Sequence, residues 1–243
     1  RGGWVVSFPR GHAYAPGWAI IRELFRFGLP TGIQGIAMNV GGVLLLGFIG
    51  SLAQSAAAQA AYAVVYTQLF SLVTWTSLGL MGAAGAVAGQ NLGAGHPDRA
   101  EQSVHLAARF ALAGAASIGF FYLFLPRELL AIFGMSEPAA VEIGAQLLRV
   151  LSLSGLLIAV ALTYTGGLQG TGDTKSPLYI SIISQVIVPL GICFVVQQTE
   201  RLDPIDIWIA ILLGHATRCA LSILRFNQGK WREIAVDIGP ARG

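Results

Sequence analysis

The chain has 243 residues, of which 54% are hydrophobic and only 11% are charged, with a net charge of +3 and a mean hydropathy of +0.66. A soluble domain carries about 25% charged residues, so this composition excludes an ordinary soluble globular protein and indicates a membrane protein. The small positive charge forms no basic patch along the sequence, which argues against binding to nucleic acid.

The first predicted element is a short amphipathic helix at residues 19–27. Its apolar residues stand beside charged ones such as Arg22 and Arg26, a pattern typical of a helix that lies on the membrane surface. We expect Gly28 to break this helix and Pro30 to stand in the first turn of the next one, where a missing N–H costs nothing.

Long apolar segments then follow one another to the end of the chain. Each is close to the ~20 residues that a helix needs to cross a bilayer. They predict six spans, at residues 29–49, 60–88, 105–125, 145–166, 178–196 and 206–224. The expected fold class is therefore an all-α integral membrane protein, a bundle of six transmembrane helices. Within the fifth span, Pro189 predicts a kink and a freed carbonyl.

Three regions organise the chain around these spans. Residues 1–28 are expected to be a cytoplasmic linker with the interfacial helix, 29–224 the transmembrane lobe, and 225–243 a loosely ordered cytoplasmic tail. The loop between the third and fourth spans, from Pro126 to Pro138, holds apolar residues between two prolines, which indicates a short amphipathic helix on the outer surface.

Basic residues are divided unevenly between the two sides of the predicted bundle. Between residues 19 and 232, nine lie on the side of both termini: Arg22, Arg26, Arg99, Arg109, Lys175, Arg218, Arg225, Lys230 and Arg232. Three lie on the other side: Arg127, Arg149 and Arg201. Because cytoplasmic segments are enriched in Lys and Arg, both termini are expected in the cytoplasm.

Two glycine-rich loops, at residues 89–99 and 166–177, each follow a long apolar helix. Neither matches a phosphate-binding motif, because no strand precedes them and the second has Asp173 where a P-loop needs lysine. The physical interpretation is that the glycines end helices in tight turns, while Asp98 and Asp173 cap the helices that follow.

These loops also carry a family resemblance. GQNLGAG at 89–95, followed by Asp98-Arg99-Ala100, resembles a cytoplasmic loop of multidrug and toxic compound extrusion (MATE) transporters. LQGTGDT at 168–174, followed by Pro177, resembles a second such loop. Together with the span number, the resemblance extends over residues 19–230.

The resemblance implies a fold and a function. MATE transporters have twelve spans in two six-helix lobes around a central cavity, so this chain resembles one lobe, the C-terminal one, with an N-terminal lobe as its missing partner. The implied function is efflux of organic, often cationic, compounds from the cell across the plasma membrane, by alternating access coupled to Na⁺ or H⁺ antiport. No other cofactor and no metal site are expected.

Two alternatives stay open. The chain could belong to a flippase of lipid-linked precursors in the same superfamily, which would need a wider and more cationic cavity. The chain could also be a fragment, since its first residue is Arg1 and not Met. A single lobe of this kind could be inactive without the other lobe.

The sequence departs from the family pattern at the positions of intramembrane carboxylates. Many members carry an acid about two turns after the proline of this lobe's first span, where this chain has Met38 and Asn39. Some carry another in the fourth span, where residues 154–160 contain none. We therefore expect the coupling carboxylate in the other lobe.

Neutral polar and aromatic residues within the spans are the candidate substrate-binding groups. Aromatic rings can bind organic cations and amides can orient them. The candidates are Gln34, Asn39, Tyr66, Tyr164 and Gln185. For each of them the alternative is a structural hydrogen bond between helices.

Other reactive groups in the spans have simpler explanations. His215 could relay protons but is more typical of a packed side chain, and Arg218 is expected to reach the cytoplasmic edge. Cys193 and Cys219 predict buried thiols. A hydrolase using Ser154 with His215 lacks the sequence context of a nucleophile, so we expect no enzymatic activity.

Overall fold

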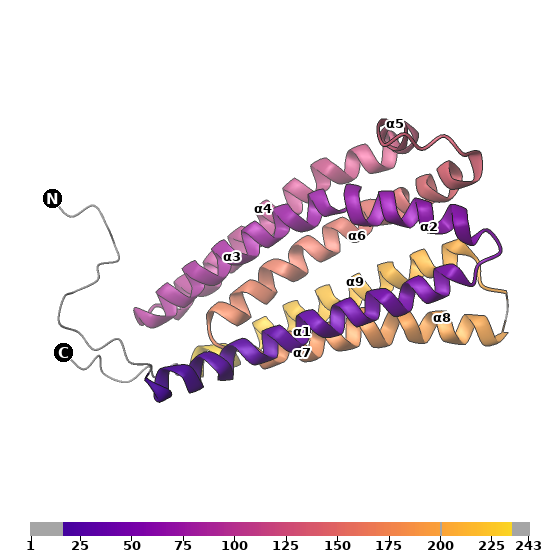
Figure 1. Cartoon of the computed structure of the whole chain (residues 1–243). Coiled ribbons are helices and arrows are strands. Elements are labelled where there is room, and N and C mark those ends of the chain that lie inside the picture. The colour runs from indigo at the N-terminus through magenta and orange to yellow at the C-terminus, as the bar shows by residue number, and fades with distance from the viewer. Residues whose placement is uncertain (1–16, 200, 235–243) are drawn as a thin grey trace, which may run out of the picture.

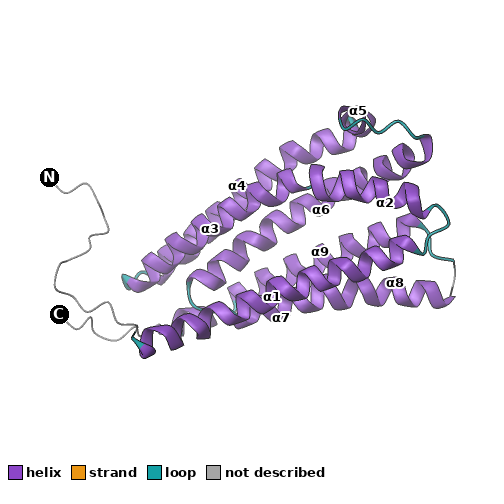
Figure 2. Ribbon diagram, viewed as in Figure 1, coloured by secondary structure: helices purple, strands orange, loops and turns teal. Residues whose placement is uncertain are grey.

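A computed structural model describes residues 17–199 and 201–234, and this described part is helical, with short loops and no strand (Figure 2). The elements are α1 (Trp18–Gly50), α2 (Ser55–Val64), the π-helical turn η1 (Val65–Leu69), α3 (Ser71–Gly93), α4 (Pro97–Phe124), α5 (Pro126–Ile132), α6 (Pro138–Gly170), α7 (Lys175–Ile182), the π-helical turn η2 (Ile183–Ile187), α8 (Val188–Thr199), α9 (Pro204–Asn227) and the 3₁₀ turn η3 (Lys230–Glu233).

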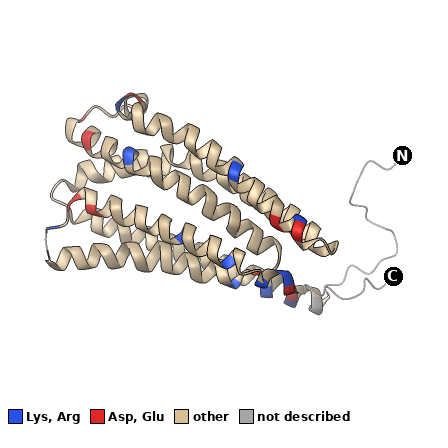
Figure 3. Ribbon diagram, turned by 180° about the vertical axis from the view of Figure 1, so that it is seen from behind, with Lys and Arg blue, Asp and Glu red and all other residues tan. Residues whose placement is uncertain are grey.

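The predicted fold class is confirmed. Within the described residues, six helical segments are long and apolar enough to cross a membrane. They are Ile20–Gly50, Ser55–Gly93, Pro97–Phe124, Pro138–Gly170, Lys175–Thr199 and Pro204–Asn227. Charged residues gather mainly toward the two ends of the bundle, leaving long uncharged stretches between them (Figure 3).

The helices form two groups that meet along α6 and α9 (Figure 1). In the first group, α2, α3 and α4 pack on α6, which is the most extensively buried helix. In the second group, α1, α7 and α8 pack together with α9. The beginning of α1 and the end of α9 lie at the same end of the bundle (Figure 1).

The expected break at Gly28 is wrong. Helix α1 runs without interruption from Trp18 to Gly50, with Pro30 inside it and not in its first turn. A proline removes one backbone hydrogen bond, which bends a membrane helix more often than it ends it. The first span therefore continues into the segment that the sequence assigned to a separate surface helix.

The described beginning of the predicted C-terminal tail is helical and packed against the bundle. Helix α9 extends to Asn227, and Arg225 forms an ion pair of 2.7 Å with the buried carboxylate of Asp173. Trp231 is buried, and its ring stacks on Phe226 with ring centroids 4.9 Å apart. Residues 1–16 of the predicted linker and 235–243 of the predicted tail lie outside the described residues.

The other local predictions are confirmed except for the cap at Asp98. The loop between the third and fourth spans contains the short helix α5, which begins at Pro126. Cys193 and Cys219 are free and buried. Asp173 accepts a hydrogen bond from the Ser176 N–H at the start of α7 and so caps that helix. Asp98 does not cap α4, because its carboxylate pairs with Arg232 instead.

The glycine loops end their helices as predicted. Gly95 and Gly172 follow α3 and α6 with φ angles of 77° and 95°, which other residues rarely adopt. The His96 N–H donates to the Asn91 carbonyl after α3, and the Asp173 N–H donates to the Leu168 carbonyl after α6. Both turns are Schellman motifs, in which a left-handed residue closes the last helical turn.

Other glycines, within α3 and α6, allow these two helices to pack closely. Gly85 and Gly89 on α3 face Gly166 and Gly170 on α6. A Cβ atom at Gly166 would overlap the Met81 carbonyl oxygen, and one at Gly85 would lie 2.9 Å from the Gly166 carbonyl oxygen. The four-residue spacing on both helices allows their backbones to touch, as small residues do in membrane bundles.

This contact yields a stability prediction. Gly166→Ala would force α3 and α6 apart, and overpacking of this kind costs about 1–3 kcal/mol. Thermal unfolding in detergent should show a clear loss of stability. The matched control is Gly82→Ala on α3, because a Cβ there meets nothing within 4 Å. Equal stability of the two variants would contradict the close crossing.

Candidate functional site

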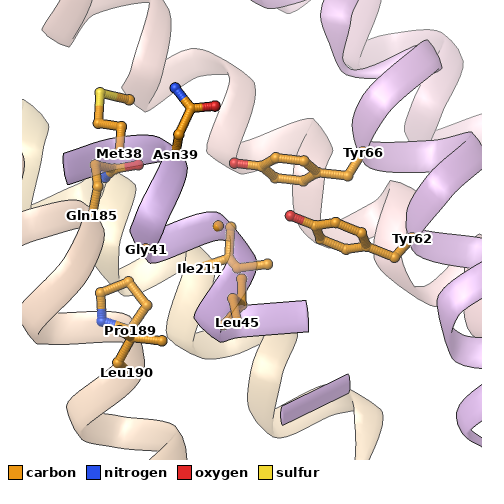
Figure 4. A pocket seen from close by; sticks show the side chains of 11 residues that line it. Met38, Asn39, Gly41, Leu45, Tyr62, Tyr66, Gln185, Pro189, Leu190 and Ile211 are labelled. Carbon is orange, nitrogen blue, oxygen red and sulfur yellow. The ribbon is translucent and has the colours of Figure 1, made fainter. Parts of the chain in front are cut away.

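A pocket of about 290 Å³ lies between the two groups of helices (Figure 4). One wall comes from Tyr62 on α2 and Tyr66 on η1. The rest comes from α1, η2, α8 and α9. The full lining is Met38, Asn39, Gly41, Gly42, Leu45, Tyr62, Tyr66, Gln185, Pro189, Leu190 and Ile211. The pocket is therefore mixed in character, with aliphatic, aromatic and amide groups and no charged side chain in its lining.

Two stacked tyrosines form the aromatic wall of the pocket. The rings of Tyr62 and Tyr66 are stacked, with centroids 4.8 Å apart and planes 9° from parallel. Trp208 stacks on Tyr62 with ring centroids 6.2 Å apart, and Phe70 packs beside Tyr66 at 5.4 Å, so each ring has a further aromatic neighbour. In Figure 4 both hydroxyl groups point toward the side of the pocket formed by α1. The pair therefore presents hydroxyl groups and ring edges to the pocket, which suit an organic ligand with apolar and polar parts.

Each side of the pocket is built at a π-helical turn. η1 contains Tyr66, and η2 contains Gln185. Pro189 follows four residues after Gln185 and has no N–H, so it removes the donor that the Gln185 carbonyl would receive in an α-helix. A π turn thus precedes Pro189 in the fifth span, while the predicted kink stays a prediction. Such turns occur frequently at functional sites, because they redirect side chains within a helix.

The five predicted binding residues do not all meet. Asn39, Tyr66 and Gln185 line the pocket together. Gln34 is 6% exposed and holds helices together: its amide nitrogen donates to Ser181 Oγ at 2.7 Å, and its oxygen accepts from Gln169 at 3.2 Å.

Tyr164 lies in a separate cluster. Its ring contacts Phe226, at a centroid distance of 5.4 Å, and His105, at 5.8 Å. It lines a shallower hollow of about 310 Å³ together with Arg109 on α4. The structure therefore places Tyr164 outside the pocket that holds the other aromatic and amide candidates.

Tyr62 is the main pocket residue missing from the sequence candidates. Its four-residue distance from Tyr66 puts both rings on one helix face, which is a signal the sequence contains. The partnership with Gln185 has no such signal, because the two residues come together only when the second and fifth spans pack.

The expectation for Arg218 is wrong. Its side chain is 2% exposed, and its Nη1 atom lies 4.0 Å from the sulfur of Met38. Helix α9 continues nine residues further, to Asn227, which is about 14 Å of helix. Arg218 therefore lies deep in the sixth span, where a charged group is expensive and usually functional.

His215 and Ser154 are also buried. The His215 ring stacks on Phe70 with centroids 5.7 Å apart, which agrees with a packed side chain. Within the described residues, neither His215 Nδ1 nor Ser154 Oγ has a hydrogen-bond partner, so the two do not form a nucleophile and base pair. No group of three His, Cys, Asp or Glu that could hold a metal ion is found in the same part of the chain.

Six membrane-crossing helices with a polar, aromatic pocket between two groups of them define a multi-pass membrane protein of the transporter class. A family model agrees with this assignment: the MatE model matches residues 30–195, which is more than half of the chain. The chain belongs to the MatE family.

Individual relatives agree with the family. A probable multidrug resistance protein NorM of Thermotoga maritima is 26% identical over 221 residues, covering 91% of this chain and 47% of the relative. A probable multidrug resistance protein YoeA of Bacillus subtilis is 26% identical over 202 residues, covering 83% of this chain and 42% of the relative. The chain thus spans about half the length of the curated relatives it matches.

Solved structures show the same fold. A crystal structure of MATE in complex with MaL6 matches with a TM-score of 0.82 and 19% identity, over 91% of this chain and 50% of that one. An outward-facing MATE family transporter of the MOP superfamily matches with a TM-score of 0.82 and 17% identity, over 91% and 49%. Both alignments correspond to a single six-helix lobe.

The different surroundings of the two glutamines yield a prediction. Gln34→Leu would break the bonds to Ser181 and Gln169, and interhelical hydrogen bonds of this kind contribute roughly 0.6 kcal/mol each. Gln185→Leu removes an amide nitrogen that has no partner within the described residues. Thermal unfolding should therefore show a loss of stability for Gln34→Leu and no loss for Gln185→Leu. The opposite order would contradict these two assignments.

Proposed function

We propose that this chain is the C-terminal lobe of a MATE-type exporter. In this proposal the lobe and an N-terminal six-helix partner together carry organic compounds out of the cell across the plasma membrane. Transport proceeds by alternating access and is driven by entry of Na⁺ or H⁺. The observation that carries the proposal is the pocket between the two helix groups, where an aromatic wall faces amide groups.

The chemistry of the pocket supports an organic substrate. The stacked pair Tyr62 and Tyr66 offers aromatic edges and two hydroxyl groups (Figure 4), and Asn39 and Gln185 offer amide groups for hydrogen bonds. The family resemblance implies that many substrates are cations, which bind well to aromatic faces. No carboxylate lines the pocket within the described residues, so we assign the coupling carboxylate to the partner lobe.

The membrane orientation follows from the distribution of basic residues, and the choice between an exporter and a flippase follows from the pocket. The excess of Lys and Arg on the side of the two termini favours a cytoplasmic location for both. A lipid-linked precursor flippase is less favoured, because it would need a wider, cationic cavity, whereas this pocket of about 290 Å³ has no charged lining and lies at the lower end of the range for small organic molecules. The partner lobe is part of the proposal, so the chain alone is expected to be inactive in transport.

Efflux from proteoliposomes tests this proposal. The chain joined to its partner lobe should expel a fluorescent organic substrate when a Na⁺ or H⁺ gradient is applied, and imposing each gradient alone identifies the coupling ion. Tyr66→Ala removes half of the aromatic wall and should lower the transport rate by up to about tenfold, in keeping with the loss of one stacking contact.

The matched control is Tyr179→Ala, because Tyr179 is 61% exposed on α7 and does not line the pocket. It should transport at the unmodified rate. Correct insertion without efflux, under either gradient, would defeat the exporter proposal.

A further inference from the structure

A shallow hollow of about 310 Å³ lies between α4 and α6, apart from the pocket of Tyr62 and Tyr66. Its lining comes from two helices only: His105, Ala108, Arg109 and Leu112 on α4, and Val160 and Tyr164 on α6. The two cavities share no lining residue. The hollow is therefore a second candidate binding place, formed by helices that do not line the first.

Arg109 gives this hollow a positive charge that the described residues leave unpaired. Its side chain is exposed, and it forms no ion pair with any carboxylate of that part of the chain. His105 lines the same hollow, and its ring lies 5.8 Å from that of Tyr164. The preceding acid on α4, Glu101, is already paired with Arg232. A charged group in a membrane span is expensive without a partner, so Arg109 requires an anion from elsewhere.

The depth of Arg109 in the span matches the level of lipid headgroups. Helix α4 has 28 residues, about 42 Å of helix, which exceeds the ~30 Å of hydrocarbon in a bilayer. Charged residues stand at its beginning, within 98–101, so the excess length lies at that end. The last ~20 residues before its end at Phe124 begin near His105. Arg109 is one turn deeper, from where a long side chain reaches the headgroup region.

The hollow is polar at one end and apolar at the other. Helix α4 begins and α6 ends at the same end of the bundle (Figure 1), so the two helices run in opposite directions. On α4, His105 and Arg109 come before Leu112, while on α6 Tyr164 comes after Val160. The polar side chains of both helices therefore lie nearer the membrane surface than the apolar ones. A phospholipid has the same order, with a charged headgroup above apolar chains.

We propose that this hollow binds an anionic phospholipid, with the phosphate on Arg109 and an acyl chain along Leu112 and Val160. A guanidinium donates two parallel hydrogen bonds to phosphate oxygens, and the His105 ring supplies a further donor. Basic pockets between transmembrane helices are typical sites for anionic headgroups. The inference is independent of the exporter proposal, because neither the first pocket nor an ion gradient takes part.

Native mass spectrometry of the detergent-purified 243-residue chain tests this site. The two lipid probes are dioleoyl phosphatidylglycerol, which is anionic, and dioleoyl phosphatidylcholine, which has the same acyl chains and no net charge. Phosphatidylglycerol should bind about fivefold more tightly, the gain expected from one arginine beside an anionic headgroup. Free glycerol phosphate has the phosphate but no acyl chain, so a large excess of it should not displace phosphatidylglycerol.

Three variants locate the preference. Arg109→Gln removes the charge and should abolish the preference for phosphatidylglycerol, whereas Arg109→Lys keeps the charge and should retain it. Arg99→Gln is the matched control, because Arg99 is exposed on the same helix and does not line the hollow; it should leave the preference unchanged. Thermal unfolding without added lipid should be the same for all three variants and the unmodified chain, since both arginines are exposed. That comparison separates a lost site from a lost fold.

Several results would overturn the lipid site. Equal affinity of the unmodified chain for the two lipids would do so, as would a preference that survives Arg109→Gln. An equal loss in Arg99→Gln would assign the preference to the general charge at this end of the bundle. Displacement by glycerol phosphate would assign the hollow to a soluble phosphate compound. A preference that disappears when the partner lobe is joined, or when the chain forms dimers, would show that protein covers this face.

Discussion

The direct backbone contact between α3 and α6 is the interaction on which the rest of the bundle depends. Gly85, Gly89, Gly166 and Gly170 bring the two helices together so closely that no Cβ atom fits between them. Helix α6 also carries the contact with α9, through which the second group of helices is attached. In a membrane, where lipid competes equally for apolar surface, such close packing provides much of the association energy.

The pocket is a consequence of how the two groups meet. The second span places its tyrosine pair at one wall, and the fifth span places Gln185 at the other, each at a π turn. Gly214 on α9 allows close approach to the fifth span, since a Cβ there would lie 2.5 Å from the Ser184 carbonyl oxygen. Irregular backbone is costly in lipid, so its presence beside a polar cavity fits a site where the helices have been shaped for binding.

Much of the fold was predictable from the amino-acid sequence. Six apolar stretches of sufficient length, the Schellman turns at Gly95 and Gly172, and the short helix after Pro126 all follow from local chemistry. The errors are local too. Pro30 was expected to begin a helix and instead lies inside one, because a membrane helix tolerates the loss of one hydrogen bond when the apolar stretch continues.

The candidate site was predictable only in part. The residue types were recognisable, yet Gln34 joins helices while Asn39, five residues later, lines the pocket. Arg218 looked close enough to the membrane edge to reach water, but α9 extends far enough beyond it to bury the charge behind Met38. Composition and periodicity establish that the chain crosses the membrane six times, because hydrocarbon forces each apolar stretch into a helix. Which polar groups share a cavity depends on helix crossings between residues distant in sequence, and those are set by tertiary packing alone.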